Sequence, residues 1–143
     1  MKLIFAGTPA NSAQALMQLA AVHEVALVIT REDAAVGRSK TVQESEVAMA
    51  ARELGLRVLK ANRITFDHLS IISGATAELA VVVAYGALIP KTALDILPWW
   101  NLHFSLLPKW RGATPLQHSI MHQGEGAGVT VFELDSGLDT GGI

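Results

Sequence analysis

The chain of 143 residues contains no cysteine. This excludes disulfides, zinc sites with thiolate ligands and a cysteine nucleophile. A basic excess is missing as well, because 11 lysines and arginines stand against 13 aspartates and glutamates, for a net charge of -2. Broad nucleic-acid-binding surfaces are usually basic. Contact with a nucleic acid would therefore need local patches or a region outside this chain.

Targeting and membrane segments are also missing. The opening stretch MKLIFAGTP holds too few apolar residues before Gly7 and Pro9 for a signal-peptide core or a membrane span. We therefore expect a cytoplasmic protein without membrane contact. What the chain does have is 50% hydrophobic and 17% charged residues, which suits one compact domain with a buried core.

Short apolar runs alternate with segments of helical periodicity along the chain, which predicts an α/β fold with an open, mainly parallel sheet. The expected strands cover residues 2–6, 25–30, a weak segment around 58, 79–84, 99–104 and 129–134. The expected helices cover residues 13–20 (capped by Asn11 or Ser12), 47–54, 64–72, 90–97 and 114–123, the last opening with a capping box from Thr114 to Gln117. The polar segment 31–43 is predicted to be a loop.

The carboxyl ends of the strands are where such sheets bind ligands. We therefore expect the chemistry just after Ala6, Thr30, Ala84, His103 and Leu134. The turn after the first strand, GTPANS, retains only the first glycine of the G-x-G-x-x-G pattern, and Pro9 lacks an amide donor. This argues against a nicotinamide or flavin site.

Asn101 and His103 stand two residues apart at the end of an expected strand, so both side chains point to one face. Asparagine can hydrogen-bond a carbonyl oxygen, and histidine can exchange a proton near neutral pH. The pair fits a catalytic site. A histidine that simply bonds a backbone carbonyl beside a turn fits the spacing equally well.

Three further groups are candidates with ordinary structural alternatives. Ser105, Leu106, Leu107 and Pro108 could wall a flat ligand or form a loop packed on the core. Asp139, in a glycine-rich loop, could orient His103 or cap its own turn. The basic residues could bind phosphate or be solvated surface charges; they are Arg38, Lys40, Lys109 and Arg111.

A metal site is not expected. His118 and His122 have the i, i+4 spacing of a helical metal pair, but the sequence HSIMH lacks the glutamate of the zinc pattern H-E-x-x-H. Solvated helix residues are the better interpretation of this pair.

Four motifs together resemble the methionyl-tRNA formyltransferase family over the whole chain. They are FAGTP at 5–9, VVVAYG at 81–86, N-x-H-x-SLLPKWRGATP at 101–115 and GVT with D-x-GLDTG at 128–141. The resemblance implies a Rossmann-like formyltransferase domain that uses 10-formyltetrahydrofolate as formyl donor and the methionine of initiator methionyl-tRNA as acceptor. It also implies no metal, and we expect a monomer for the full-length protein.

The resemblance also implies residue roles. Asn101, His103 and Asp139 would form the catalytic trio, Ser105 to Pro108 would line the folate site, and Arg38 with Lys40 would contact tRNA. Phe104 stands where the family usually has a small residue and is expected to narrow the pocket. Residues 1–143 would be an incomplete catalytic domain, with the basic tRNA-binding barrel of the family outside this chain. The alternatives are formylation of an amino sugar nucleotide or a purine precursor, and a folate-binding fragment without turnover.

Overall fold

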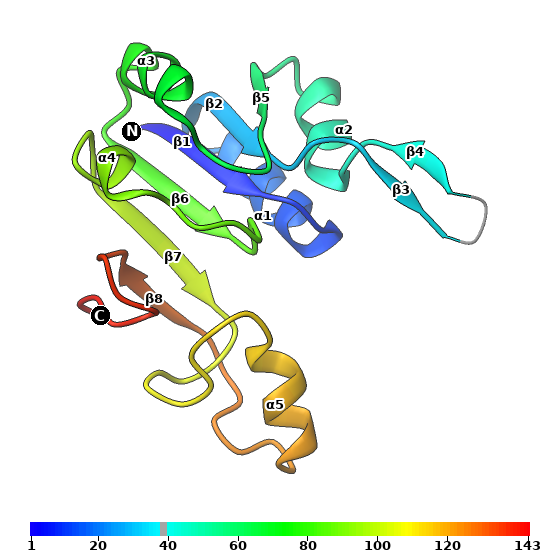
Figure 1. The fold of residues 1–143 in the computed structure, drawn as a ribbon, viewed down its shortest axis with the longest axis vertical. Coiled ribbons are helices and arrows are strands. Elements are labelled where there is room, and N and C mark those ends of the chain that lie inside the picture. Colours follow the sequence, from blue (N-terminus) through cyan, green and yellow to red (C-terminus); the bar gives the residue numbers. More distant parts are fainter. Residues whose placement is uncertain (38–39) are drawn as a thin grey trace.

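The computed structural model describes residues 1–37 and 40–143, and its centre is a six-stranded sheet of order β5-β2-β1-β6-β7-β8 (Figure 1). The strands are β1 (Lys2–Gly7), β2 (Glu24–Thr30), β5 (Val58–Lys60), β6 (Leu79–Val83), β7 (Trp99–His103) and β8 (Thr130–Glu133). All neighbours pair in parallel except β8, which runs antiparallel to β7. The prediction of an α/β fold with a mainly parallel sheet is confirmed.

Four helices cover the two faces of the sheet. They are α1 (Ala10–Ala20), α2 (Glu46–Glu53), α3 (Phe66–Gly74) and α4 (Lys91–Leu94), and a further helix, α5 (Pro115–Met121), lies beyond β7. One core cluster joins α1 and α2 to the sheet through residues such as Leu16 and Val47, and the other joins α3 and α4 through Ile72 and Ala93. Burial on both faces explains why β1 and β6 are almost continuously apolar. None of the helices in the described part of the chain is long and apolar enough to cross a bilayer.

The predicted cap of α1 is wrong, whereas α5 has Thr114 as its N-cap and Pro115 as its first residue, as predicted, but lacks the side-chain bond of a capping box. Helix α1 starts directly after Pro9, and neither Asn11 nor Ser12 is its N-cap. Ser12 is buried, and its hydroxyl donates to the carbonyl of Val83 at 2.5 Å, which ties α1 to β6 instead. Thr114 makes no side-chain cap bond, because its ψ of 50° departs from the extended backbone that an N-cap normally adopts.

Residues 31–43 are not a plain loop, which corrects the sequence prediction. They contain an antiparallel hairpin of β3 (Ala34–Val36) and β4 (Thr41–Gln43). The strands of three residues each are too short to give a period-two signal. The hairpin extends away from the body of the protein (Figure 1). Its base is held from β5, where Lys60 forms ion pairs with Asp33 at 2.6 Å and Glu44 at 2.8 Å.

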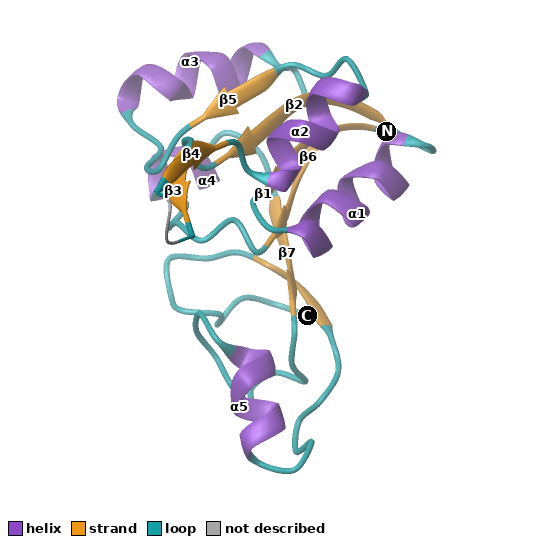
Figure 2. Cartoon of the chain, turned by 90° about the vertical axis from the view of Figure 1, so that its right-hand side faces the viewer, coloured by secondary structure: helices purple, strands orange, loops and turns teal. Residues whose placement is uncertain are grey.

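The chain between β7 and β8 consists mainly of loops. Residues 104–129 form a long excursion of loops around α5, and both views place this helix apart from the helices that cover the sheet (Figures 1 and 2). The chain then returns along β8, the last strand in the sheet order. This excursion starts at the end of β7, where the sequence predicts the catalytic pair.

Candidate active site

The end of β7 carries Asn101 and His103 on one face of the strand. Trp99, on the same face, packs into the core beneath α3 and α4, whereas Leu102 packs toward α1 and α2. Strand alternation therefore distributes the side chains as the sequence predicts. Because β7 pairs in parallel with β6, the segment following β6 leaves the sheet at this same edge. Strand β8 is antiparallel and ends beside Trp100, so the segment that follows β8 turns back toward this edge, where Asp139 accepts a hydrogen bond from the N–H of Gly112.

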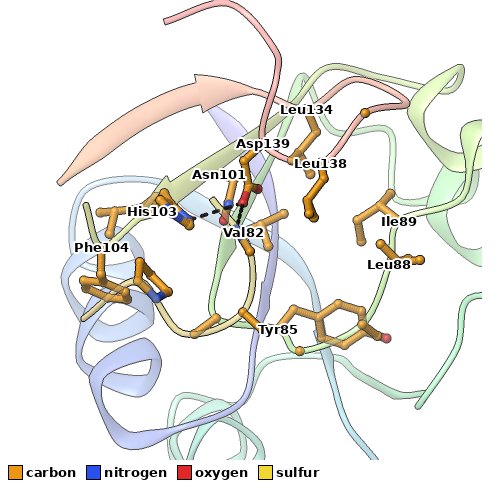
Figure 3. Close-up of a pocket in the computed structure, with 18 of the residues that line it drawn as sticks. Val82, Tyr85, Leu88, Ile89, Asn101, His103, Phe104, Leu134, Leu138 and Asp139 are labelled. Carbon is orange, nitrogen blue, oxygen red and sulfur yellow. Dashed lines mark hydrogen bonds and ion pairs between the residues drawn. The ribbon is translucent and has the colours of Figure 1, made fainter. Parts of the chain in front are cut away.

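A cavity of about 510 Å³ opens at this edge, and Asn101, His103 and Asp139 line it together (Figure 3). Its other walls come from the segment after β6 and the segment after β8. The apolar lining residues include Val82, Leu88, Ile89, Leu134 and Leu138. A mostly apolar cavity with a few polar groups at one place is typical of a small-molecule site.

His103 is held in one orientation. Its side chain is 5% exposed, and Nε2 lies 2.9 Å from the carbonyl oxygen of Trp110. A carbonyl oxygen can only accept, so Nε2 carries the proton of this bond. The other ring nitrogen, Nδ1, faces the carboxylate of Asp139, with 3.8 Å between Nδ1 and Oδ2. His103 is therefore a carbonyl-bonded histidine that also lines the cavity, and its catalytic role stays a prediction.

The carboxylate of Asp139 is fixed by the backbone. Its Oδ2 accepts from the N–H of Gly112 at 2.7 Å, and its φ of 51° is left-handed, a conformation that aspartate adopts more readily than most residues. The same loop is closed by Asp135, whose carboxylate accepts from the Thr140 hydroxyl and the Gly137 N–H, both at 2.8 Å. These hydrogen bonds, first that from Thr140, lower the pKa of Asp135 below its ordinary value.

Asn101 is the least constrained of the three polar groups. Within residues 1–37 and 40–143, no side chain or backbone group forms a hydrogen bond with its amide, and the residue is partly exposed at the cavity wall. An amide N–H directed at a cavity can donate to an oxygen that gains negative charge. The arrangement therefore supplies a donor, an oriented imidazole and a carboxylate around one space.

The four residues after Phe104 were expected to form a wall of the ligand site, but the structure places them outside the cavity. None of Ser105, Leu106, Leu107 and Pro108 is among the residues that line the cavity. Ser105 is buried, and its hydroxyl donates to the carbonyl of Lys109 at 2.6 Å. Thr130 on β8 donates to the Ser105 carbonyl at 2.7 Å and accepts from the Leu107 N–H at 3.0 Å. The turn is thus tied to Lys109, the neighbour of the residue whose carbonyl holds His103, and a contact with folate stays a prediction.

Phe104 does line the cavity, but its side chain also packs against the core on the side of α1 and α2. The expected narrowing of the pocket by this ring stays a prediction.

The basic candidates that the structure describes do not line the cavity. Lys40 is exposed at the turn of the β3–β4 hairpin, and Arg38 lies outside the described residues. Lys109 is paired with Glu125, and this hydrogen bond is the main cause of the lowered pKa of Glu125. Arg111 is exposed and does not line the cavity.

His118 and His122 stack on Trp110, with ring centroids 5.6 and 4.5 Å away. In the described residues, no group of three or more His, Asp or Glu side chains is placed to hold a metal ion.

Sequence reasoning missed the residues of the cavity walls. Residues 85–89 follow β6, and Leu134 and Leu138 follow β8. The rule that ligands bind beyond strand ends did point to the positions after Ala84 and Leu134. Nothing in the chemistry of leucine and isoleucine distinguishes these residues from core residues, so the individual side chains needed the structure.

The sequence is similar to known formyltransferases. The formyl transferase family matches residues 1–143. Methionyl-tRNA formyltransferase of Acidothermus cellulolyticus is 51% identical over an alignment of 147 residues that covers 100% of this chain and 45% of that protein. Methionyl-tRNA formyltransferase of Clavibacter sepedonicus is 48% identical over 146 residues, covering 100% of this chain and 48% of that protein. The chain thus spans about half the length of the curated relatives it matches.

Solved structures share the fold. A phosphoribosylglycinamide formyltransferase from Bacillus halodurans has a TM-score of 0.81 at 20% identity, with 100% of this chain and 76% of that chain covered. A sugar N-formyltransferase from a Shewanella species has a TM-score of 0.67 at 17% identity, with 99% of this chain and 54% of that chain covered.

Proposed function

Because the chain belongs to the formyl transferase family, we propose that it carries the site that moves a formyl group from 10-formyltetrahydrofolate to the α-amino group of methionine on initiator methionyl-tRNA. The proposal includes a role in translation initiation, and it takes residues 1–143 as part of the catalytic domain. The observation that supports it most is the meeting of Asn101, His103 and Asp139 at the wall of one apolar cavity (Figure 3). The curated relatives with this name support the choice of acceptor.

The residues suit the chemistry of formyl transfer. The acceptor nitrogen attacks the formyl carbon, the carbonyl oxygen becomes an oxyanion, and the bond from carbon to the donor nitrogen then breaks. The amide of Asn101 would donate to that oxyanion. The imidazole of His103 would stabilise the same charge from Nδ1, since Nε2 is occupied by the carbonyl of Trp110 at 2.9 Å.

Formyl transfer also requires a proton transfer, in which Asp139 would assist His103. The attacking amine loses one proton and the leaving nitrogen of the donor gains one, so the site must carry a proton between two points of the cavity. Asp139 lies 3.8 Å from Nδ1 of His103, close enough to stabilise the imidazolium and too far to hold its proton in a hydrogen bond. The carboxylate would therefore orient the ring while leaving Nδ1 available to take the proton from the attacking amine and return it to the leaving nitrogen.

The apolar walls would hold the flat ring of the donor. Leu88 and Ile89 come from the segment after β6, and Leu134 and Leu138 from the segment after β8 (Figure 3). A planar heterocycle buried between two such walls gains from apolar contact on both faces. No metal takes part in this proposal, and folate-derived one-carbon donors are the chemistry that the formyl transferase family name implies.

The test compares acceptors. Residues 1–143 would be joined to the remaining part of the Acidothermus relative, so that the chain is assayed at the length of that relative. We expect this chimera to formylate initiator methionyl-tRNA and not an amino sugar nucleotide or glycinamide ribonucleotide. Replacing His103 by alanine should lower kcat roughly 100- to 1,000-fold. Formylation of the sugar or the purine precursor alone would overturn the proposed acceptor.

A second measurement separates binding from turnover. The donor should raise the melting temperature of the wild-type chimera, because a ligand that binds only the folded state stabilises it. His103→Ala should keep most of this shift while losing turnover. A shift without turnover in the wild-type chimera would indicate a folate-binding protein and would contradict the catalytic proposal.

A further inference from the structure

Arg31 directly follows β2, at the same edge of the sheet as the catalytic pair, because β2 and β7 both run parallel with β1 and β6. It precedes the β3–β4 hairpin, which starts at Ala34. The hairpin projects from this end of the sheet (Figure 1). Arg31 therefore lies between the hairpin and the cavity.

Two contacts fix its guanidinium. Nε donates to Oδ1 of Asn62 at 3.1 Å, and Nη1 donates to the carbonyl of Gly86 at 3.3 Å. Asn62 is held in turn, because its Nδ2 donates to Oε2 of Glu32 at 2.9 Å. Gly86 is one of the residues that line the cavity. The arginine thus lies against the rim of the cavity in a defined orientation.

The guanidinium charge of Arg31 is exposed. No acidic side chain in residues 1–37 and 40–143 forms an ion pair with it, whereas Lys60 and Lys109 are both paired with acids. An arginine has five N–H donors, and the two hydrogen bonds named above leave three of them available. A fixed guanidinium with free donors is suited to bidentate binding of a phosphate.

The position indicates which substrate would supply the phosphate. The apolar walls that suit the donor ring are Leu88, Ile89, Leu134 and Leu138, and Arg31 is not among the residues that line the cavity. It meets the rim at Gly86, on the side of the hairpin. A nucleic-acid strand that contacts Lys40 on the hairpin and ends at His103 would pass this point.

We propose that Arg31, oriented by Asn62 and the carbonyl of Gly86, binds a backbone phosphate near the 3′ end of the acceptor RNA. This inference rests on the proposed function. Arg31 would be a binding residue that guides the acceptor end into the cavity, and it would take no part in the chemical step. Its removal should therefore change acceptor affinity and leave the formyl transfer itself intact.

The experiment uses the chimera described above with Arg31→Gln and Arg31→Lys, and with Arg57→Gln as matched control. Arg57 is also exposed, but it precedes β5 at the opposite end of the sheet. We expect Arg31→Gln to raise KM for initiator methionyl-tRNA about tenfold, with kcat within about twofold. The slope of log affinity against log salt should fall by about one. Arg31→Lys should keep the salt slope and restore part of the affinity, and Arg57→Gln should behave as wild type.

Two results would overturn the inference. One is an acceptor KM in Arg31→Gln equal to that of Arg57→Gln. The other is a raised KM for the donor with an unchanged acceptor KM, which would assign Arg31 to a carboxylate of the donor. If the wild-type chimera shows no formyl transfer, the proposed function fails separately. In that case, the affinity of the same proteins for unacylated initiator tRNA tests the contact between Arg31 and phosphate. Equal affinities for wild type and Arg31→Gln would refute this contact.

Discussion

The buried apolar side chains divide unequally between residues 1–103 and residues 104–143. The first region holds the two core clusters, whereas in the second the buried residues are Ser105, Pro115, Ser119, Thr130 and Phe132. Non-glycine residues with positive φ occur in both regions, as Lys40, Thr76 and Ala84 in the first and as Trp110, Gln123 and Asp139 in the shorter second region. Apolar burial holds the sheet region together, while the loop-rich region depends on hydrogen bonds and turns.

The polar links of the loop-rich region converge on the candidate site. Thr130 connects β8 to the turn after β7, the carbonyl of Trp110 holds His103, and the N–H of Gly112 holds Asp139. Hydrogen bonds fix direction as well as distance, which apolar contacts do not. A catalytic region built this way can be positioned accurately while contributing little to the stability of the domain.

The largest expected effect tests this division directly, with the same substitution in both regions. Leu27→Ala removes a fully buried side chain from the sheet core and should lower the free energy of unfolding by roughly 2–5 kcal/mol. Leu116→Ala acts on α5, where the leucine is 54% exposed, and should change it by about 0.5 kcal/mol or less. Urea unfolding followed by circular dichroism measures both changes in unfolding free energy. Equal losses would contradict the claim that apolar burial stabilises mainly residues 1–103.

The second prediction concerns activity without loss of stability. Asp139→Asn keeps an oxygen that can accept from Gly112 but removes the charge facing His103. We expect kcat to fall roughly 100-fold, with a loss in unfolding free energy of about 1 kcal/mol or less. The assay is single-turnover formyl transfer by the chimera, beside urea unfolding. A variant that keeps normal kcat would remove Asp139 from the mechanism.

The two regions also differ in how far the sequence predicts them. Strands such as β1 and β6 can be predicted from the sequence because they are buried on both faces and almost purely apolar. Asn101 and His103 can be predicted as site residues because polar residues at a strand end break that pattern. The hydrogen bonds that complete the site come mainly from backbone groups of Trp110 and Gly112, which every residue possesses. No side-chain pattern can predict them.

The cavity walls illustrate the same limit. Family resemblance assigns folate contact to Leu106 and Leu107, whereas neither of them lines the cavity and Leu138 does. Which of these leucines faces a space depends on the path of the loops, and that path is fixed by long-range bonds such as the one between Thr130 and the carbonyl of Ser105. The residue types are the same in both cases, so only the structure separates the two assignments.

The third prediction decides between those assignments. Leu138→Ala should weaken donor binding about tenfold, because its side chain is 61% exposed without ligand and would be covered by the donor ring. Leu107→Ala should change donor binding by about twofold or less. Melting temperature against donor concentration gives both affinities. A larger loss of donor affinity in Leu107→Ala than in Leu138→Ala would support the folate contact that the resemblance implies. It would mean that the donor ring does not lie against Leu138.

The smallest expected effect concerns the β3–β4 hairpin, which belongs to the sheet region but is held at its base by charge. Lys60 joins Asp33, before β3, to Glu44, after β4. The hydrogen bond from Lys60 is the main cause of the lowered pKa of Glu44, and the hydrogen bonds to Asp33 and Glu44 raise the pKa of Lys60. These side chains are about one-third exposed to solvent, and ion pairs that solvent reaches stabilise proteins weakly.

The signs of the two shifts set the pH dependence. A lowered carboxyl pKa stabilises the fold above the ordinary value of 4.5, and this contribution disappears as the pH falls through the pKa of folded Glu44. A raised lysine pKa stabilises the fold below the ordinary value of 10.5, and this contribution disappears as the pH rises through the pKa of folded Lys60. The difference in melting temperature between wild type and Lys60→Met should therefore be largest near neutral pH and should shrink toward both extremes. Arg57→Met, which removes a cation without a described ion pair, should show no such maximum. A pH-independent difference for Lys60→Met would mean that its methylene chain, and not its charge, holds the base of the hairpin.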